Sequence, residues 1–554
     1  MDITPDALFK LNEQLRTDAS GMQRLWTECG RMCLTRKVSS LLTAISGSTT
    51  QDANISPDTR LLNTIAVEAN EGLASGLMSW VMPYEGRWFS WKPAPEQDGN
   101  EALEEWLAAC TEVALTALAT SNFYPAAHEA LLDRGTFGTA TLWAQEGKRN
   151  PLMFRCWDAG TFVIGEDEEG YVDTAFREFE LTAKQAQERF GDNLPPQVAN
   201  KLATKPMEKD RYLHAIVPRA ESQRSPNGGP QSMPIASIIL HKDSKLVVSN
   251  SGFEELPAIV TRHLRWSEAS AYGASPAMKA LAEIRGVNYL ELLMSTLAET
   301  QVNPRMILPQ GYEGTPDLRA GGITMGGLTR DMFPVEWMTQ GNLNFGLALI
   351  ERKEDAVRQA FHAKLFDLFS TRKGDLNIPH VQALQAEQLG RISPAFTSLT
   401  TGFINPILER VFMILYRAGK LPPPPREAFV ANAVGQPLLL FPRVVQTNRM
   451  SQEIQAAKRS RFMEMFQVAA SMAQAGRPEV FDNIDGDKAT RDIATDSGLR
   501  DLLVPLDERE RIRQQRAAVQ QAQQQREMLM EAAKSPEIVK QVTGALGGAQ
   551  EAAA

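Results

Sequence analysis

The clearest pattern of apolar and polar positions along the chain is two helical segments with a turn-rich segment between them. From Ser275 to Gln301, apolar residues recur at steps of three and four, which predicts a helix with one apolar stripe. Unbroken, it would be roughly 40 Å long at 1.5 Å per residue. Ser275 suits the N-cap and Pro276 the first helical position. A second helical pattern runs from Phe345 to Phe369. The apolar positions are Ile284, Val287, Leu290, Met294 and Leu297 in the first helix and Ile350, Val357, Phe361 and Leu365 in the second.

In the segment between these helices, residues 302–344, the stretch 303–334 carries four prolines and six glycines with short apolar runs between them. That composition predicts loops and short strands. The second helix is followed by STRKGDLNIPH, a polar stretch that ends at His380 and contains Gly374 and Pro379. The predicted order is therefore helix, small β insert, helix and exposed loop.

The first 270 residues mix both periodicities. Helical patterns cover residues 5–33, 59–82 and 101–121, and strand patterns separated by turn residues dominate 152–179 and 211–260. We expect Thr182 to cap a short helix that ends at Phe190. This predicts one α+β unit over residues 1–270.

The C-terminal part is mostly helical in pattern. Residues 381–419 contain Pro394 and Pro406, each of which predicts a kink or a break, and FPRVVQ near residue 445 predicts a strand. From Thr447 onward nearly the whole chain has a helical pattern. Residues 505–534 are charged and rich in glutamine, so this segment cannot bury a core alone, and we expect the last residues to be disordered.

Composition narrows the possible functions. The chain has 554 residues, 43% of them hydrophobic, which is enough for a sizeable core. The net charge is −9, whereas proteins that grip DNA phosphates usually carry a basic excess. The four cysteines show no metal-ligand spacing, and so few in so long a chain indicate a reducing compartment. We expect no signal peptide, no membrane-spanning helix, no metal and no cofactor.

Three local groups invite a chemical interpretation, and each has a structural alternative. Trp88, Phe89 and Trp91 could stack on bases, but aromatic packing at a core edge is favoured. His128, Glu129 and Asp133 do not match a metal-binding pattern, so we expect a solvated helix face. GEDEEG, near residue 168, lacks the spacing of a calcium loop and predicts a hairpin turn. The sequence has no P-loop, no G-x-S-x-G and no H-E-x-x-H motif, so we predict that it is not an enzyme.

Five segments, in this order along the chain, resemble the portal (head-to-tail connector) proteins of short-tailed, T7-like bacteriophages. They are EGRWFSW (85–91), SNFYPAAHEALLDRGTFGTATLW (121–143), DEEGYVDTAFREFELTAKQAQERFG (167–191), YGASPAMKALAEIRGVNYLELLMSTLAETQVNPRMILPQ (272–310) and INPILERVFMILYRAGKLPPPP (404–425). One departure is NIPHVQAL, ending at Leu384, where many relatives carry a TATEV-like segment.

The resemblance implies a domain plan for an α+β portal fold. Residues 1–270 would form the wing, 271–301 and 345–370 the two stem helices, and 302–344 the clip between them. Residues 371–380 would form the loop that faces the DNA channel. Residues 381–446 would form a long kinked helix that returns to the wing, 447–504 the crown, and 505–554 a barrel helix with a mobile tail.

Two groups of residues follow as candidate sites. In the channel loop, Arg372, Lys373, Asp375 and Asn377 would touch passing DNA weakly, with ordinary solvation of the cations as the alternative. In the clip, Met325, Arg330, Met332 and Trp337 would form a docking surface. The alternative is that Trp337 packs on its own small sheet.

The resemblance also implies partners. The chain would form a dodecameric ring at one capsid vertex, in the virion, after assembly in the host bacterial cytoplasm. The terminase large subunit, tail adaptor and tail tube proteins, and major capsid and scaffolding proteins would dock on it, and double-stranded DNA would pass through without sequence recognition. A ring-shaped tail adaptor and a hydrolase in the N-terminal domain are the rival functions.

Overall fold

The computed structural model describes residues 3–39, 41–42, 61–94, 97, 100–226, 228–302, 305–307, 335–337, 343–363, 394–431, 437–439 and 441–447. Beyond residue 448 it describes only short helical pieces between 465 and 523, and these belong to a separate compact unit. The first unit, residues 1–448, carries the whole of the fold described below. Predictions that concern other residues lie outside the described part of the chain.

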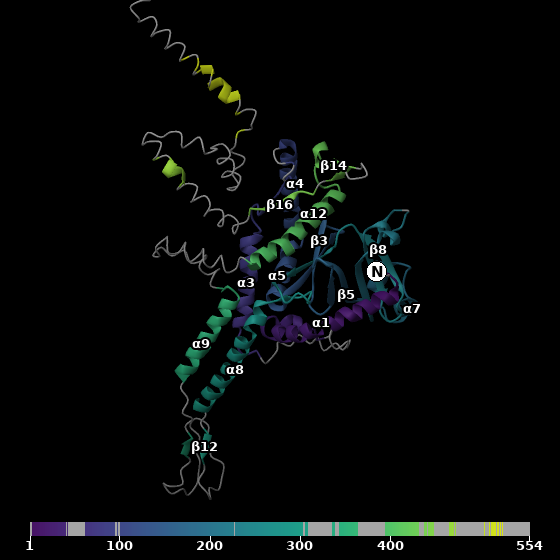
Figure 1. Ribbon diagram of the computed structural model, residues 1–554. Helices are drawn as coiled ribbons and strands as arrows, with labels where there is room; N and C mark the ends of the chain where they lie inside the picture. Colours follow the sequence, from purple (N-terminus) through teal and green to yellow (C-terminus); the bar gives the residue numbers. More distant parts are fainter. Residues whose placement is uncertain are drawn as a thin grey trace, which may run out of the picture. The chain divides into compact units, whose positions relative to one another are not determined.

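Two antiparallel sheets form the β part of this unit (Figure 1). One sheet has five strands in chain order, each paired with the next. They are β4 (Phe162–Glu166), β5 (Val172–Thr182), β6 (Lys209–Pro218), β7 (Ile235–His241) and β8 (Val247–Phe253). The other has the order β3 (Leu152–Trp157), β2 (Thr139–Glu146) and β9 (Ala258–Arg262). The α+β class predicted from the alternating patterns is confirmed.

Helices pack around these sheets and supply much of the core. They are α1 (Pro5–Cys33), α3 (Ile65–Val81), α4 (Glu101–Thr120), α5 (Phe123–Phe137), α6 (Ala183–Phe190), α7 (Pro196–Thr204), α8 (Pro276–Val302), α9 (Leu343–Ala360) and α12 (Asn405–Arg417). α5 is central, since it touches α1, α3, α8 and both β2 and β3. Trp26 of α1 is fully buried and donates its indole N–H to the Phe137 carbonyl at 2.8 Å, so the ends of α1 and α5 are fixed together.

Four further strand pairs complete the β structure of the described residues. The largest joins β1 (Phe89–Lys92) to β16 (Arg443–Gln446), so the segment that follows α12 returns to the N-terminal part. The other pairs are β10 (Leu264–Arg265) with β11 (Gly273–Ala274), β12 (Arg305–Ile307) with β13 (Val335–Trp337), and β14 (Phe429–Ala431) with β15 (Pro437–Leu439). Trp88, Phe89 and Trp91 are buried at this join, which confirms core packing and leaves no platform for bases.

Several predicted local features are confirmed at their residues. Thr182 caps α6 in a capping box with Gln185. The predicted turn joins β4 to β5, with the Asp167 carboxylate accepting two main-chain N–H groups and Gly170 at φ 83°. Cys29 and Cys33 are buried and unbridged.

Two predicted helix limits are wrong. The helix expected from residue 59 starts at Ile65, because the side chain of Asn63 accepts the N–H of Ile65 and replaces the preceding turn. α9 ends at Ala360 instead of near 370, and His362 has a left-handed φ of 56° that a helix cannot contain.

Pro406 was predicted to kink or break its helix, and α12 begins at Asn405, one residue before this proline. The residues just before, Thr400–Ile404, form a π-helical turn. In the first turn of an α-helix the main-chain N–H groups have no acceptor within the helix, so a proline there costs no hydrogen bond. The predicted interruption is therefore the change from π-helix to α-helix directly before Pro406.

One close approach fixes where α5 meets β2. Gly138 has a φ of 76°, and a Cβ placed on it would lie 2.2 Å from the Gly273 carbonyl oxygen. Only glycine fits both the conformation and the contact. This contact holds the chain directly before α8 against the end of α5. Within the described residues, no helix is long and apolar enough to cross a membrane.

Candidate functional site

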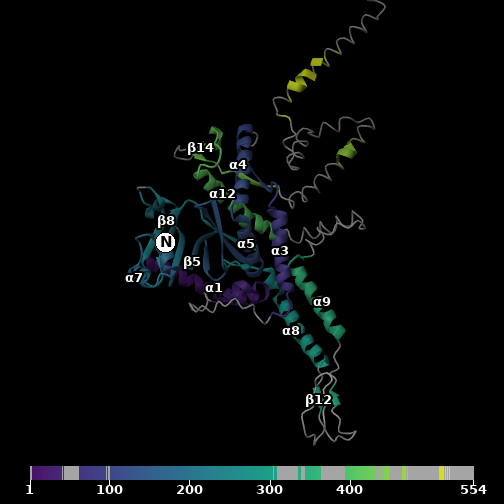
Figure 2. The ribbon, with the colours of Figure 1, turned by 180° about the vertical axis from the view of Figure 1, so that it is seen from behind.

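The candidate site is built on α8 and α9, which form an antiparallel hairpin. In both views the two helices lie side by side, with β12 beyond their ends (Figures 1 and 2). Lys353 packs on Gly286 and forms an ion pair with Glu283 at 2.6 Å. Nearer the far end, the Met294 side chain packs against Gly346 so closely that a Cβ there would lie 2.2 Å from its sulfur. Glycine therefore sets the close spacing of the two helices.

The base of the hairpin is held by the start of α8. Ser275 accepts the Met278 N–H at 2.9 Å as the N-cap and donates its hydroxyl to the Thr136 carbonyl at 2.8 Å. The predicted cap is thus confirmed, and it also links α8 to α5. The predicted apolar stripe turns inward here, with Ile284 and Val287 buried.

Two asparagines connect the hairpin to the chain before α3, a connection that the sequence did not indicate. The Asn288 side-chain oxygen accepts the main-chain N–H groups of Leu62 and Asn63, at 2.9 and 3.2 Å. The Asn63 amide in turn donates to Glu291 of α8 at 3.2 Å and to Glu354 of α9 at 2.8 Å. One short segment therefore ties both helices together.

Beyond Asn288, no residue of α8 is fully buried. Large apolar side chains are exposed on this part of the hairpin. They are Tyr289, Leu292, Leu293 and Val302 on α8 and Leu347 on α9. Tyr289, Leu292 and Leu293 recur at steps of three and four, so they share one face of α8.

The predicted site residues lie beyond the hairpin or after it. In the predicted clip, β12 pairs with β13, and the main chain of Trp337 stands opposite Arg305. Met325, Arg330 and Met332 lie outside the described residues, as do Arg372, Lys373, Asp375 and Asn377 of the predicted channel loop. Both sites therefore stay predictions.

A buried charged cluster holds the end of α1 against α5. Lys37 forms ion pairs with Asp133 at 2.7 Å, Glu129 at 3.2 Å and Asp158 at 3.5 Å. The Asp133 side chain is only 1% exposed, so the predicted solvated face is wrong for this residue. Burial raises the pKa of Asp133 to about 6, although Lys37 lowers it. Cys156 donates its thiol to the same carboxylate at 3.3 Å.

This cluster carries more acidic groups than basic ones. Burial lowers the pKa of Lys37, but the carboxylates of Asp133 and Asp158 raise it more. Burial likewise raises the pKa of Glu129, while Arg36 and Lys37 bring it below its usual value. The cluster joins three elements, and we interpret it as structural because Lys37 stays charged and unreactive.

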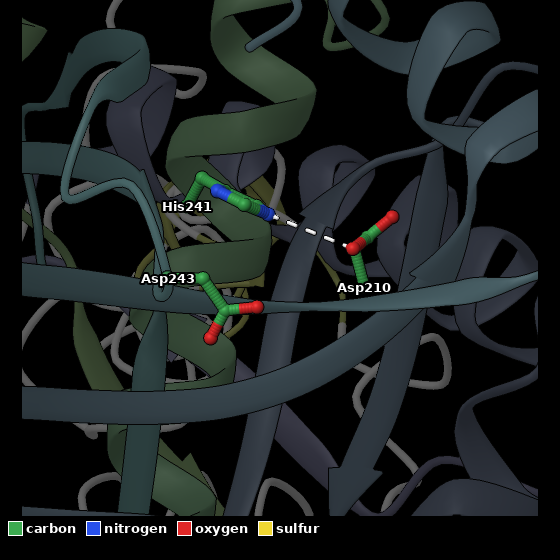
Figure 3. A group of neighbouring side chains, drawn as sticks. All are labelled: Asp210, His241 and Asp243. Atoms are coloured by element: carbon green, nitrogen blue, oxygen red, sulfur yellow. Dashed lines mark ion pairs between the residues drawn. The ribbon is translucent and has the colours of Figure 1, made fainter. Parts of the chain in front are cut away.

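A second group brings possible metal ligands together. The ligand atoms of Asp210, His241 and Asp243 lie within 4.8 Å of one another (Figure 3). Lys201 already donates to the Asp210 carboxylate at 2.7 Å and supplies its counter-charge. Nδ1 of His241 accepts the main-chain N–H of Ser244 at 3.2 Å, which leaves the ring proton of a neutral imidazole on Nε2, facing Asp210. A protonated Nε2 has no lone pair for a metal, so the group fits an ion-pair cluster.

Comparison with known proteins assigns the chain to a family. Residues 6–502 match the family model described as the bacteriophage head to tail connecting protein. The chain belongs to this family. The resemblance drawn from the five sequence segments is confirmed. The matched range includes α8, α9 and both strands between them.

Two relatives of this connecting protein cover most of its length. The probable portal protein of Bordetella phage BPP-1 is 26% identical over 533 residues, which is 94% of this chain and 92% of the relative. The portal protein of Salmonella phage epsilon15 is 24% identical over 477 residues, 84% of each chain.

Proposed function

We propose that this chain is a portal protein, a dodecameric ring at one capsid vertex through which double-stranded DNA is packaged and later ejected. The terminase large subunit docks on the ring during packaging, and tail adaptor and tail tube proteins dock on it afterwards. Capsid and scaffolding proteins surround it in the virion. The family match over residues 6–502 supports this function, as do the two portal relatives.

The observation that carries the proposal is the exposed apolar face of the hairpin. Tyr289 is 62% exposed, Leu292 50% and Leu293 46%, all on one face of α8. Covering a leucine or an aromatic side chain contributes roughly 1.5–3 kcal/mol when burial is complete. In a ring, a neighbouring copy covers this face, and the contact repeats around the closed circle.

The test is the mass of the purified protein and its symmetry in rotationally averaged negative-stain images. A ring with a central hole is expected, far above the 61.2 kDa monomer. Leu292→Glu with Leu293→Glu should shift the protein toward smaller species. A matched control, Met207→Glu with Leu246→Glu, changes two exposed apolar residues outside the hairpin and should leave the ring intact. A wild-type monomer at micromolar concentration in physiological salt contradicts the proposal.

The channel loop and the clip belong to the same proposal. Each phosphate contact adds to DNA affinity, so a conduit works best with few basic contacts, and the net charge of −9 suits this. We assign weak DNA contact to Arg372 and Lys373, with Asp375 and Asn377 in the same loop. In the clip, deleting residues 311–330 should abolish terminase or tail-adaptor binding and leave the thermal midpoint of the rest unchanged. If the deletion variant bound both partners normally, the assignment of the clip as their docking surface would be wrong.

A further inference from the structure

Three arginines from separate elements lie close enough for their charges to repel one another. Arg155 comes from edge strand β3, Arg177 from β5 and Arg189 from α6. The guanidinium carbon of Arg177 lies 5.1 Å from the centre of the Trp157 ring and 6.0 Å from that of Phe179. The guanidinium carbon of Arg189 lies 5.1 Å from the same Phe179 ring. Stacking on these rings holds the guanidinium groups in place.

These three charges lack counter-ions within the part of the chain that the structure describes. No carboxylate there forms an ion pair with Arg155, Arg177 or Arg189. Other arginines of the same unit are paired, such as Arg262 with Glu166 and Arg410 with Glu255. What distinguishes this group is that three unpaired guanidinium groups from separate elements lie close enough for their charges to interact.

The group also contains a buried donor with nothing to bond. The Nε–H of Arg177 is buried and has no acceptor, which costs free energy. Burial lowers the pKa of Arg177 to about 10, and the neighbouring charges of Arg155 and Arg189 lower it as well. Asp158 acts in the opposite direction, but its carboxylate is paired with Lys37 at 3.5 Å. An anion beside the three guanidinium groups would relieve the repulsion between them.

We propose that Arg155, Arg177 and Arg189 bind the phosphate backbone of double-stranded DNA, at a site separate from the loop at 371–380. The proposal rests on the proposed function, which brings DNA to this protein. Planar guanidinium groups match the oxygen geometry of phosphate, and contacts to the backbone carry no sequence information.

A phosphate backbone fits this surface better than an acidic protein does. Protein interfaces depend on large apolar or aromatic anchors at their centre. No large apolar side chain is exposed on the described residues of β3, β5 or α6. A contact to the DNA backbone needs no such anchor, and three cations give a weak affinity for DNA that falls as the salt concentration rises.

The test uses the assembled protein and covalently closed circular DNA, which cannot thread a closed ring and so reports on contacts outside the channel. Binding is measured by gel shift at several salt concentrations. Arg155→Gln with Arg189→Gln removes two exposed charges. Each phosphate contact contributes about 0.9 to the slope of log affinity against log salt, so the slope should shrink by at least about 1.8.

The control is Arg24→Gln with Arg149→Gln, which removes the same charge from exposed positions elsewhere and should leave the slope unchanged. If the first double variant elutes differently from wild type, Arg189→Gln alone replaces it, with an expected decrease of at least about 0.9.

Two results would overturn the inference. In one, wild type fails to bind the circle, or the double variant binds it as the control does. In the other, a 20-residue polyglutamate peptide binds wild type and loses binding in the double variant while DNA binding does not change, which would assign the surface to an acidic protein. The mass of each sample is measured as well, because it tests the proposed function independently. A protein that assembles into a ring but does not bind circular DNA would refute only the present inference.

Discussion

Replacing Lys37 with methionine tests how the buried charged cluster stabilises the fold. The Lys37 ammonium group forms ion pairs with three carboxylates, of which Asp133 is the closest at 2.7 Å and is only 1% exposed. Methionine has a similar length but no charge, so Lys37→Met leaves the buried Asp133 carboxylate without a counter-ion. Removing one member of a buried ion pair costs about 3–5 kcal/mol of unfolding free energy.

Removing the other partner should cost less. In Asp133→Asn, Lys37 keeps Glu129 at 3.2 Å and Asp158 at 3.5 Å, so its charge stays compensated. The loss is then that of one buried hydrogen bond and a poorly placed amide, about 1–2 kcal/mol. Arg36→Gln is the matched control, because Arg36 is half exposed and its pair with Glu129 contributes at most about 1 kcal/mol.

The pH dependence has a definite sign. The pKa of Asp133 rises from 3.8 to about 6 on folding, so the folded state binds a proton more tightly than the unfolded state does. Stability from this group is therefore highest below pH 4 and falls as the pH rises to about 6. Without Lys37 the pKa rises further. The deficit of Lys37→Met should then be larger at pH 8 than at pH 5.

The assay is the thermal midpoint at one fixed scan rate, measured at pH 5 and pH 8. At about 2 °C per kcal/mol for a large domain, Lys37→Met should lose roughly 6–10 °C at pH 8 and Asp133→Asn roughly 2–4 °C. Equal losses for the two variants, or a Lys37→Met deficit that does not shrink at pH 5, would refute the assignment of Lys37 as the counter-ion of a buried Asp133.

Three further outcomes are expected. Asn288→Ala should cost about 2 kcal/mol, because two main-chain N–H groups lose their acceptor, and hydrogen exchange before α3 should accelerate; unchanged exchange would show that the link is dispensable. Gly346→Val should weaken the hairpin by about 1–3 kcal/mol through a clash with Met294, and Met294→Ala should recover part of the loss, so purely additive effects would contradict the contact. Replacing Arg372 and Lys373 with alanine should leave ring mass intact and change the amount of DNA packaged or retained, whereas failed assembly would make the pair structural.

Long-range polar contacts explain most of what the sequence did not predict. Asp133 was expected on a solvated face, yet it is covered and paired with Lys37, 96 positions earlier in the chain. Asn63 and Asn288 meet across 225 positions. An asparagine or aspartate has the same local signature in a loop, on a surface or in a core, so only the packed structure shows which contact it makes.

Two helix caps, in contrast, could be predicted from the sequence. Ser275 and Thr182 cap their helices because a hydroxyl positioned before the first turn bonds the nearest free N–H, which needs no distant partner. The apolar stripe of α8 followed from its spacing. Only the tertiary structure decided that this stripe is buried up to Asn288 and that apolar side chains are exposed beyond it. Periodicity states which residues share a face, whereas burial depends on which other elements reach that face.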